Sequence, residues 1–101
     1  NLGSVIKTFG NRLARDLVEE KTSKESRAFP AELIRTARRK LLSVHAAHSL
    51  LDLTIPPGNR LHKLKGEMKD RHAIAVNDQW RVSFIWSDGN AFEVKVEDYH
   101  S

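Results

Sequence analysis

Three sets of side chains in this sequence could move protons, bind phosphates or hold a metal ion. The first is the basic segment R-L-H-K-L-K-G at residues 60–66, which continues to Lys69 and Arg71. Histidine titrates near neutral pH, so His62 could transfer protons, and the cations around it could neutralise phosphates of a nucleic acid. The same cations could instead be solvated charges that protect a strand edge from aggregation, and charge alone favours that interpretation.

The other two sets lie at the end of an expected strand and on an expected helix. Asp98, Tyr99 and His100 place three hydrogen-bonding side chains together, although a frayed terminus would look the same. His45 and His48 have a helical spacing that could hold a metal ion. No carboxylate nearby completes that set and the chain has no cysteine, so we interpret both as histidines at the core edge or surface. We expect neither a metal nor another cofactor.

Length and composition restrict the class of protein. With 101 residues, 40% of them hydrophobic, the chain can build one core, and we expect a single domain over residues 5–101. We interpret residues 1–4 as the remnant of a tag, the alternative being a natural processed terminus. No apolar run approaches the length of about 18 residues that a membrane span needs, and no apolar signal sequence is present, so we expect a cytoplasmic protein. The net charge of +4 assigns no partner by itself.

The elements that position these groups follow from periodicity and turn signals. A short strand is expected over residues 5–9, followed by a helix that Asn11 caps. The polar segment 21–27 has no apolar anchor and is expected to be a mobile loop. Pro30 suits the first turn of a second helix, whose apolar residues recur every three or four positions up to His48 and whose exposed side is basic.

After a break at residues 56–59 the pattern becomes strand-like. The expected strands are residues 60–64, 72–76, 79–86 and 92–99. The turns between them are short, and the D-G-N run at 88–90 is the clearest hairpin signal. Because short hairpins require antiparallel pairing, the sequence predicts an α+β fold.

Alternation along the last two strands predicts which side chains face the helices. The side chains expected on this core face are Trp80, Val82, Phe84, Phe92, Val94 and Val96. Neighbouring residues of a strand point to opposite faces, so Arg81 and Tyr99 are expected on the other side of the sheet. We call this side, which carries Arg81 and Tyr99, the open face, and we expect the site to lie there.

Taken together, the motifs resemble those of one known family. They are I-K-T-F at residues 6–9, the basic segment 60–66, N-D-Q-W-R at 77–81 and the terminal D-Y-H at 98–100. In this order and spacing they are similar to HigB-type toxins, the plasmid-maintenance killer branch of the RelE superfamily of type II toxin–antitoxin systems. The similarity covers residues 5–100, although Lys63 stands where many relatives have proline.

The resemblance implies a fold, an activity and partners. An N-terminal strand and two helices would pack on a small curved antiparallel sheet, and the protein would be a ribosome-dependent endoribonuclease that cuts mRNA in the decoding site. A helix-turn-helix antitoxin of the HigA type would neutralise it. The implied active-site residues are His62, Lys65, Arg81, Asp98, Tyr99 and His100. The expected RNA-binding residues are Arg60, Lys63, Lys69 and Arg71.

The residue types suggest how such a site would cut RNA. The 2′-OH of the RNA would attack the adjacent phosphorus without a metal, while Lys65 and Arg81 stabilise the phosphorane. His62 or the terminal histidine would move protons. Tyr99 would stack on or orient a base, and Asp98 would fix a neighbouring histidine or the substrate.

Two other functions are compatible with a basic surface. A module that binds RNA or the ribosome without cutting would arrest growth and leave transcripts intact. A DNA-binding regulator could use the arginine-rich second helix. The long polar segment before that helix argues against the regulator, because a helix-turn-helix joins its helices by a turn of about three or four residues.

Overall fold

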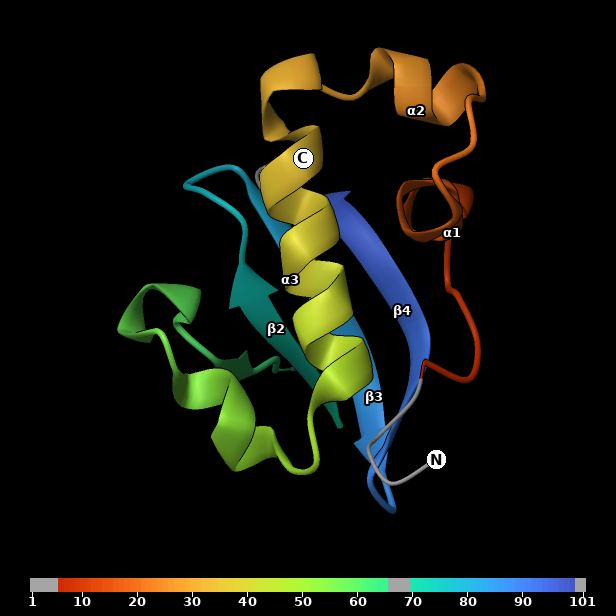
Figure 1. Ribbon diagram of the computed structural model, residues 1–101. Helices are drawn as coiled ribbons and strands as arrows, with labels where there is room; N and C mark the ends of the chain where they lie inside the picture. The colour runs from red at the N-terminus through yellow and green to blue at the C-terminus, as the bar shows by residue number, and fades with distance from the viewer. Residues whose placement is uncertain (1–5, 66–69, 100–101) are drawn as a thin grey trace.

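Residues 6–65 and 70–99, the two ranges that the computed structural model describes, form three α-helices and a four-stranded sheet (Figure 1). The helices are α1 (Arg12–Glu19), α2 (Lys24–Ala28) and α3 (Ile34–Ala46). The strands are β1 (His62–Lys63), β2 (Arg71–Ala75), β3 (Trp80–Ser87) and β4 (Asn90–Asp98). The sheet order is β1-β2-β3-β4 and every neighbouring pair is antiparallel. The predicted α+β fold is confirmed.

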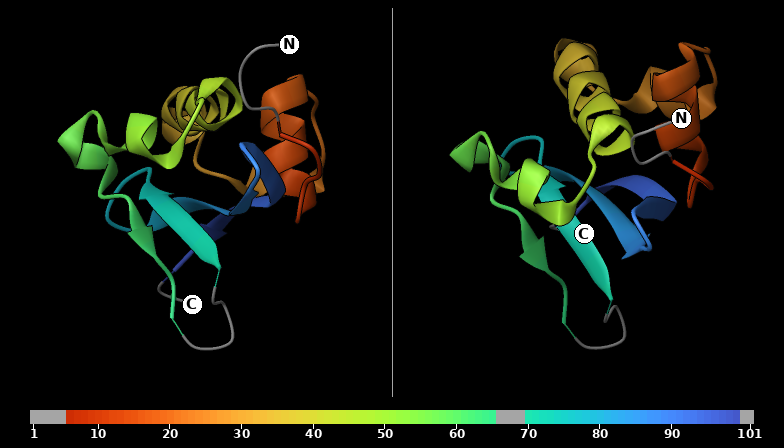
Figure 2. Two further views of the ribbon diagram at one scale, coloured as in Figure 1. Left: turned by 90° about the horizontal axis from the view of Figure 1, so that it is seen from below. Right: turned by 60° about the horizontal axis from the view of Figure 1, so that its bottom comes forward.

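The helices cover one face of the sheet, and the core lies between the two layers (Figures 1 and 2). α3 runs across this face and buries Ala37, Leu41 and Val44, while α1 packs beside α3 and β4. The core also contains Leu17, Leu53, Ile74, Val82, Phe84, Ala91, Val94 and Val96. Within the described ranges, no helix is long and apolar enough to cross a membrane.

Capping chemistry sets the start of α1, as predicted. The Asn11 Oδ1 accepts a hydrogen bond from the Ala14 N–H at 3.1 Å. The Asn11 Nδ2 donates to the Val96 carbonyl at 2.9 Å, so the same side chain fastens the helix to β4. The helix ends at Glu19, and its C-cap residue Glu20 adopts a left-handed backbone conformation (φ 60°).

The predicted N-terminal strand over residues 5–9 is wrong. In the part of this segment that the structure describes, two isolated parallel bridges join Ile6 to Ala91 and Phe9 to Val94. Thr8 and Lys7, between the two bridges, form no bridge, and the chain bends at Gly10 and Asn11 before α1 begins at Arg12. The segment therefore lies along β4 as an edge contact.

The predicted mobile loop at residues 21–27 is also wrong, because most of it belongs to α2. Ser23 and Ser26 form a reciprocal cap, in which each hydroxyl accepts the backbone N–H of the other residue, at 3.2 and 2.8 Å. Phe29, directly after the helix, is buried and packs edge-on against Trp80 with ring centroids 4.8 Å apart. Local capping and an apolar anchor just beyond the polar run order this segment.

The chain between α3 and β1 makes two short 3-10 turns, Leu50–Thr54 and Pro57–Asn59. Asn59 is buried and ties them to the core. Its Nδ2 donates to the Leu53 carbonyl at 3.1 Å, and its Oδ1 accepts from the Lys40 Nζ at 2.5 Å. This anchor fixes the point from which β1 starts.

The hairpin between β3 and β4 turns at residues 88–89 as predicted, but a bulge corrects one expected side chain. From the pair Ser83–Lys95 to the pair Ile85–Phe92, β3 advances by two residues and β4 by three. The extra residue of β4 forms the bulge, within which Glu93 has a φ of 50°. The extra residue reverses the alternation towards the hairpin. Ala91 consequently lies in the core in place of the predicted Phe92, which pairs with Ile85 instead.

Candidate active site

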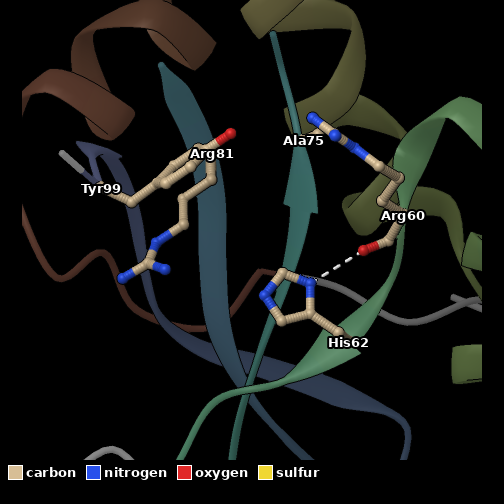
Figure 3. Close-up of a pocket in the computed structure, with 5 residues that line it drawn as sticks. All are labelled: Arg60, His62, Ala75, Arg81 and Tyr99. Atoms are coloured by element: carbon tan, nitrogen blue, oxygen red, sulfur yellow. Dashed lines mark hydrogen bonds between the residues drawn. The ribbon is translucent and has the colours of Figure 1, made fainter. Parts of the chain in front are cut away.

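A hollow of about 240 Å³ opens at one end of the open face (Figure 3). Its lining residues are Arg60, His62, Ala75, Arg81 and Tyr99. They come from the start of β1, the end of β2, the start of β3 and the residue after β4. These strand ends are neighbours in an antiparallel sheet with the order β1-β2-β3-β4. The topology thus brings together four of the predicted residues: Arg60, His62, Arg81 and Tyr99.

The local backbone orients His62. Arg60 follows the turn Pro57–Asn59 in the left-handed region, with a φ of 50°, and its N–H donates to the Pro57 carbonyl at 3.0 Å. Its own carbonyl lies 2.8 Å from the His62 Nδ1 (Figure 3). A carbonyl can only accept a hydrogen bond, so Nδ1 carries the hydrogen and, in the neutral ring, Nε2 carries the lone pair. The ring is therefore held with a proton acceptor available on its far nitrogen.

Arg81 is held on two sides. Its Nε lies 2.7 Å from the Oε2 of Glu97, the residue directly opposite on β4. Its guanidinium carbon lies 5.4 Å from the centroid of the Tyr99 ring, within range of a cation–π contact. Tyr99 is itself fixed, because its N–H donates to the Gln79 carbonyl at 3.1 Å and its hydroxyl donates to the Asn77 carbonyl at 3.2 Å.

The other predicted residues lie outside the hollow or outside the described residues. Lys63 and Lys65 are exposed and do not line it. Asp98 stands opposite Trp80, a core-face residue, and accepts a hydrogen bond from the Gln79 Nε2 at 2.7 Å. Lys69 and His100 are not among the described residues.

Arg71 occupies a place that differs from the expected one. Its side chain is only 7% exposed. The guanidinium donates to the Ser83 Oγ at 3.1 Å and to the Glu93 carbonyl at 2.5 Å, and it pairs with the Glu93 carboxylate at 3.6 Å. Burial lowers the pKa of Arg71, an effect that the charges of Glu97 and Glu93 oppose. We therefore assign Arg71 to holding the bulge in β4 rather than to binding RNA.

His45 and His48 form no metal site with the rest of the described chain. The His45 Nδ1 accepts a hydrogen bond from the Ile6 N–H at 3.1 Å, which ties the N-terminal segment to α3. Within residues 6–65 and 70–99, no three His, Asp or Glu side chains lie close enough together to hold a metal ion.

Sequence reasoning missed Glu97, whose carboxylate contacts the lining residue Arg81. Alternation along β4 places it on the same face as Tyr99, which the sequence already shows. Its contact with Arg81 depends on the register of β3 against β4. Counting back from the hairpin fails to give that register, because the bulge adds a residue to β4.

The fold and the hollow define a small α+β protein that presents a histidine, arginines and a tyrosine on the open face of an antiparallel sheet. A family model described as "RelE-like toxin of type II toxin-antitoxin system HigB" matches residues 9–100. The chain belongs to this family of HigB toxins. A toxin of a type II system has an antitoxin as its partner.

The sequence and the fold of this chain are also similar to those of known toxins. The toxin HigB-1 of Vibrio cholerae serotype O1 is 38% identical over 76 residues, which cover 75% of this chain and 80% of that protein. A protein of Proteus vulgaris named endoribonuclease HigB is 39% identical over 41 residues, or 41% of this chain and 45% of that protein. The crystal structure of YafQ from E. coli strain BL21(DE3) shares the fold, with a TM-score of 0.56, 94% of both chains covered and 12% identity.

Proposed function

We propose that this toxin is an endoribonuclease that cuts mRNA in the decoding site of the ribosome and thereby stops translation. The observation that carries the proposal is the meeting of His62, Arg81 and Tyr99 in one hollow. These residues supply a proton acceptor, a fixed positive charge and an aromatic ring, which metal-free RNA cleavage can use. The name of the Proteus vulgaris relative supports the same activity.

His62 is the general base in this proposal. Its Nε2 takes the proton of the 2′-OH, and the 2′-oxygen then forms a bond to the adjacent phosphorus. The hydrogen bond from Nδ1 to the Arg60 carbonyl favours the tautomer that this step needs. A positioned base of this kind contributes about 10²- to 10⁴-fold to the rate.

Arg81 stabilises the negative charge that gathers on the phosphorane oxygens. The bond from phosphorus to the 5′-oxygen then breaks, and a general acid protonates that oxygen. The products are a 2′,3′-cyclic phosphate and a free 5′-OH. We keep His100 as the proposed acid and Lys65 as a second cation at the phosphate. The ring of Tyr99, which lines the hollow, would stack on a base.

The remaining polar residues take supporting roles. Arg60 lines the hollow, and its ion pair with Asp78 is long (3.7 Å) and exposed, so its charge stays available to the RNA backbone. Lys63 and Lys69 would contact phosphates further along the strand. Asp98 fixes Gln79, whose carbonyl accepts from the Tyr99 N–H, and so holds the end of β4.

We propose a helix-turn-helix protein of the HigA type as the antitoxin. Its gene would neighbour the toxin gene, and co-expression of the two should abolish toxicity and give a complex that co-purifies. A toxin that stays lethal with the neighbouring gene product present would overturn this assignment.

The test of the activity is to map mRNA 5′ ends in a translation extract with and without the protein. The variants are His62→Gln and Arg81→Gln, and the matched controls are His48→Gln and Arg39→Gln, which replace exposed residues of the same types outside the hollow. We expect new ends within translated frames, bearing a 5′-OH. The two site variants should lose at least about 10²-fold in cutting rate, and the controls should match the wild type.

Each alternative has its own outcome. Arrest of translation with intact transcripts would favour an inhibitor that binds without cutting. Cuts in RNA free of ribosomes would overturn the ribosome dependence. New ends bearing a 5′-phosphate would overturn the attack by the 2′-OH, because that attack leaves the phosphate on the 3′ side.

A further inference from the structure

The proposed chemistry uses Arg81 but leaves the Glu97 carboxylate beside it without a role. The Arg81 Nε lies 2.7 Å from the Glu97 Oε2, and the two side chains are only 18% and 20% exposed. This is the shortest ion pair among the described residues. Surface ion pairs of exposed side chains contribute little, but a short pair that is shielded from water holds its geometry.

We propose that Glu97 is a positioning residue for RNA cleavage: by accepting the Nε–H of Arg81 it fixes the guanidinium for the phosphorane. This inference rests on the proposed function and adds a residue that acts only through Arg81. The carboxylate engages the Nε alone among the nitrogens of Arg81. The two terminal nitrogens, with four N–H donors, thus have no hydrogen-bond partner within the described chain and stay available to a phosphate.

The second side of the clamp is the Tyr99 ring. The guanidinium carbon lies 5.4 Å from the ring centroid, and backbone and hydroxyl hydrogen bonds hold the ring in turn. A free arginine side chain samples many rotamers, and ordering it during the reaction would raise the barrier. A guanidinium held between a carboxylate and a ring is already in place when charge develops on the phosphate.

The surroundings of Glu97 favour this role over that of a proton acceptor. Besides Arg81, the carboxylate acts on Arg71, whose pKa it raises against the lowering by burial. Its Oε2 already accepts the Nε–H of Arg81 at 2.7 Å. Taking the proton of the 2′-OH would also break the contact that orients Arg81.

The variants Glu97→Ala and Glu97→Gln separate the hydrogen bond from the charge, since the glutamine oxygen still accepts from Nε. Glu93 gives the matched control: on the same strand it pairs with Arg71 at 3.6 Å and does not line the hollow. Single-turnover cleavage of mRNA on programmed ribosomes gives the rate at saturation and the toxin concentration at half-saturation. The exchange of the Arg81 Nε–H with water, followed by NMR on the isolated protein, reports the clamp without catalysis.

We expect Glu97→Ala to lower the saturated rate by about 10- to 100-fold with less than about a threefold change in half-saturation. Glu97→Gln should recover most of the rate, and the pH profile should keep its shape in both variants. The Arg81 Nε–H should exchange slowly in the wild type and in Glu97→Gln, and fast in Glu97→Ala. Glu93→Ala should match the wild type in rate and in Arg81 exchange.

Three results would overturn the inference. Glu97→Ala could cut at the wild-type rate. Glu97→Gln could be as inactive as Glu97→Ala and lose one limb of the pH profile, which would make Glu97 a base. Both variants could cut faster, which would mean that Glu97 only weakens the charge of Arg81. Where the wild type cuts no RNA, the proposed function fails, and the exchange of the Nε–H alone decides whether the clamp exists.

Discussion

Replacing Asn59 with alanine should destabilise this protein strongly, although the residue lies in the connection between α3 and β1. Asn59 is 1% exposed. Its side chain donates to the Leu53 carbonyl at 3.1 Å and accepts from the Lys40 Nζ at 2.5 Å. The same Nδ2 makes a longer hydrogen bond, of 3.4 Å, to the Ile55 carbonyl. The variant removes all three hydrogen bonds and leaves the buried Leu53 carbonyl without this partner.

The magnitude follows from the two shorter contacts, to Leu53 and Lys40. A neutral hydrogen bond contributes about 1 kcal/mol to stability. A hydrogen bond from a charged group contributes about 1.5 kcal/mol at the lower end, which suits Lys40 because it is only half-buried. We therefore expect the free energy of unfolding to fall by about 2.5 kcal/mol. With an m value of about 1.5 kcal/mol/M, the urea midpoint falls by about 1.7 M.

Urea unfolding followed by circular dichroism measures this shift, and Asn90→Ala is the matched control. Asn90 is half-exposed and donates one long hydrogen bond, of 3.3 Å, to the Asp88 carbonyl within its own hairpin. Its replacement should change stability by less than about 0.5 kcal/mol. Equal midpoints for the two variants would refute the reasoning that Asn59 anchors the connection.

Three further predictions follow from buried contacts elsewhere. Gly10→Ala should cost about 1 to 3 kcal/mol, because its Cβ would lie 2.8 Å from the Glu93 carbonyl oxygen and 2.7 Å from the Lys95 Cγ. The Cβ of Gly58→Ala would meet nothing within 4 Å, so this variant should unfold at the wild-type temperature or above. Equal losses of stability in Gly10→Ala and Gly58→Ala would contradict this difference. Arg71→Ala should lower the free energy of unfolding by about 2 to 4 kcal/mol, measured by urea unfolding, while the folded variant keeps its affinity for RNA in a filter-binding assay. Weaker RNA binding at unchanged stability would instead indicate that Arg71 contacts a phosphate. The pKa of His72 lies below its ordinary value of 6.5, first because of burial and then because of Lys63, so the unfolded chain takes up this proton at a higher pH than the folded protein. The free energy of unfolding should therefore fall as the pH drops from 6.5 towards the lowered pKa, and His72→Phe should remove this part of the acid sensitivity. An equal loss of stability in the wild type and in His72→Phe between pH 7.5 and 5.5 would contradict this prediction.

Signals that act over a few residues could be interpreted from the sequence. The Asn11 cap, the turn at residues 88–89 and the alternation of β3 all lie where they were predicted. Their energies come from neighbours in the chain, so no knowledge of the packing was needed. The motifs likewise pointed to the HigB family before any contact between them was known.

Two errors concern segments whose structure depends on distant contacts. Residues 21–27 lack an apolar side chain, and the helix there is anchored by Phe29, which packs on Trp80 some fifty residues further along the chain. Phe92 was expected in the core because strict alternation was assumed through a strand that contains a bulge. A bulge adds one residue on one strand only, which the composition of that strand does not reveal.

The amino-acid sequence was enough to place Arg81 and Tyr99 on the open face, because successive side chains of a strand point to opposite faces whatever packs around it. It did not say which charges meet across the sheet. Arg81 pairs with Glu97, and the buried Arg71 holds Glu93. The registers of β2 against β3 and of β3 against β4 decide which of these side chains meet. Register is a property of the assembled sheet, so only the tertiary structure could separate the arginine of the hollow from the arginine of the bulge.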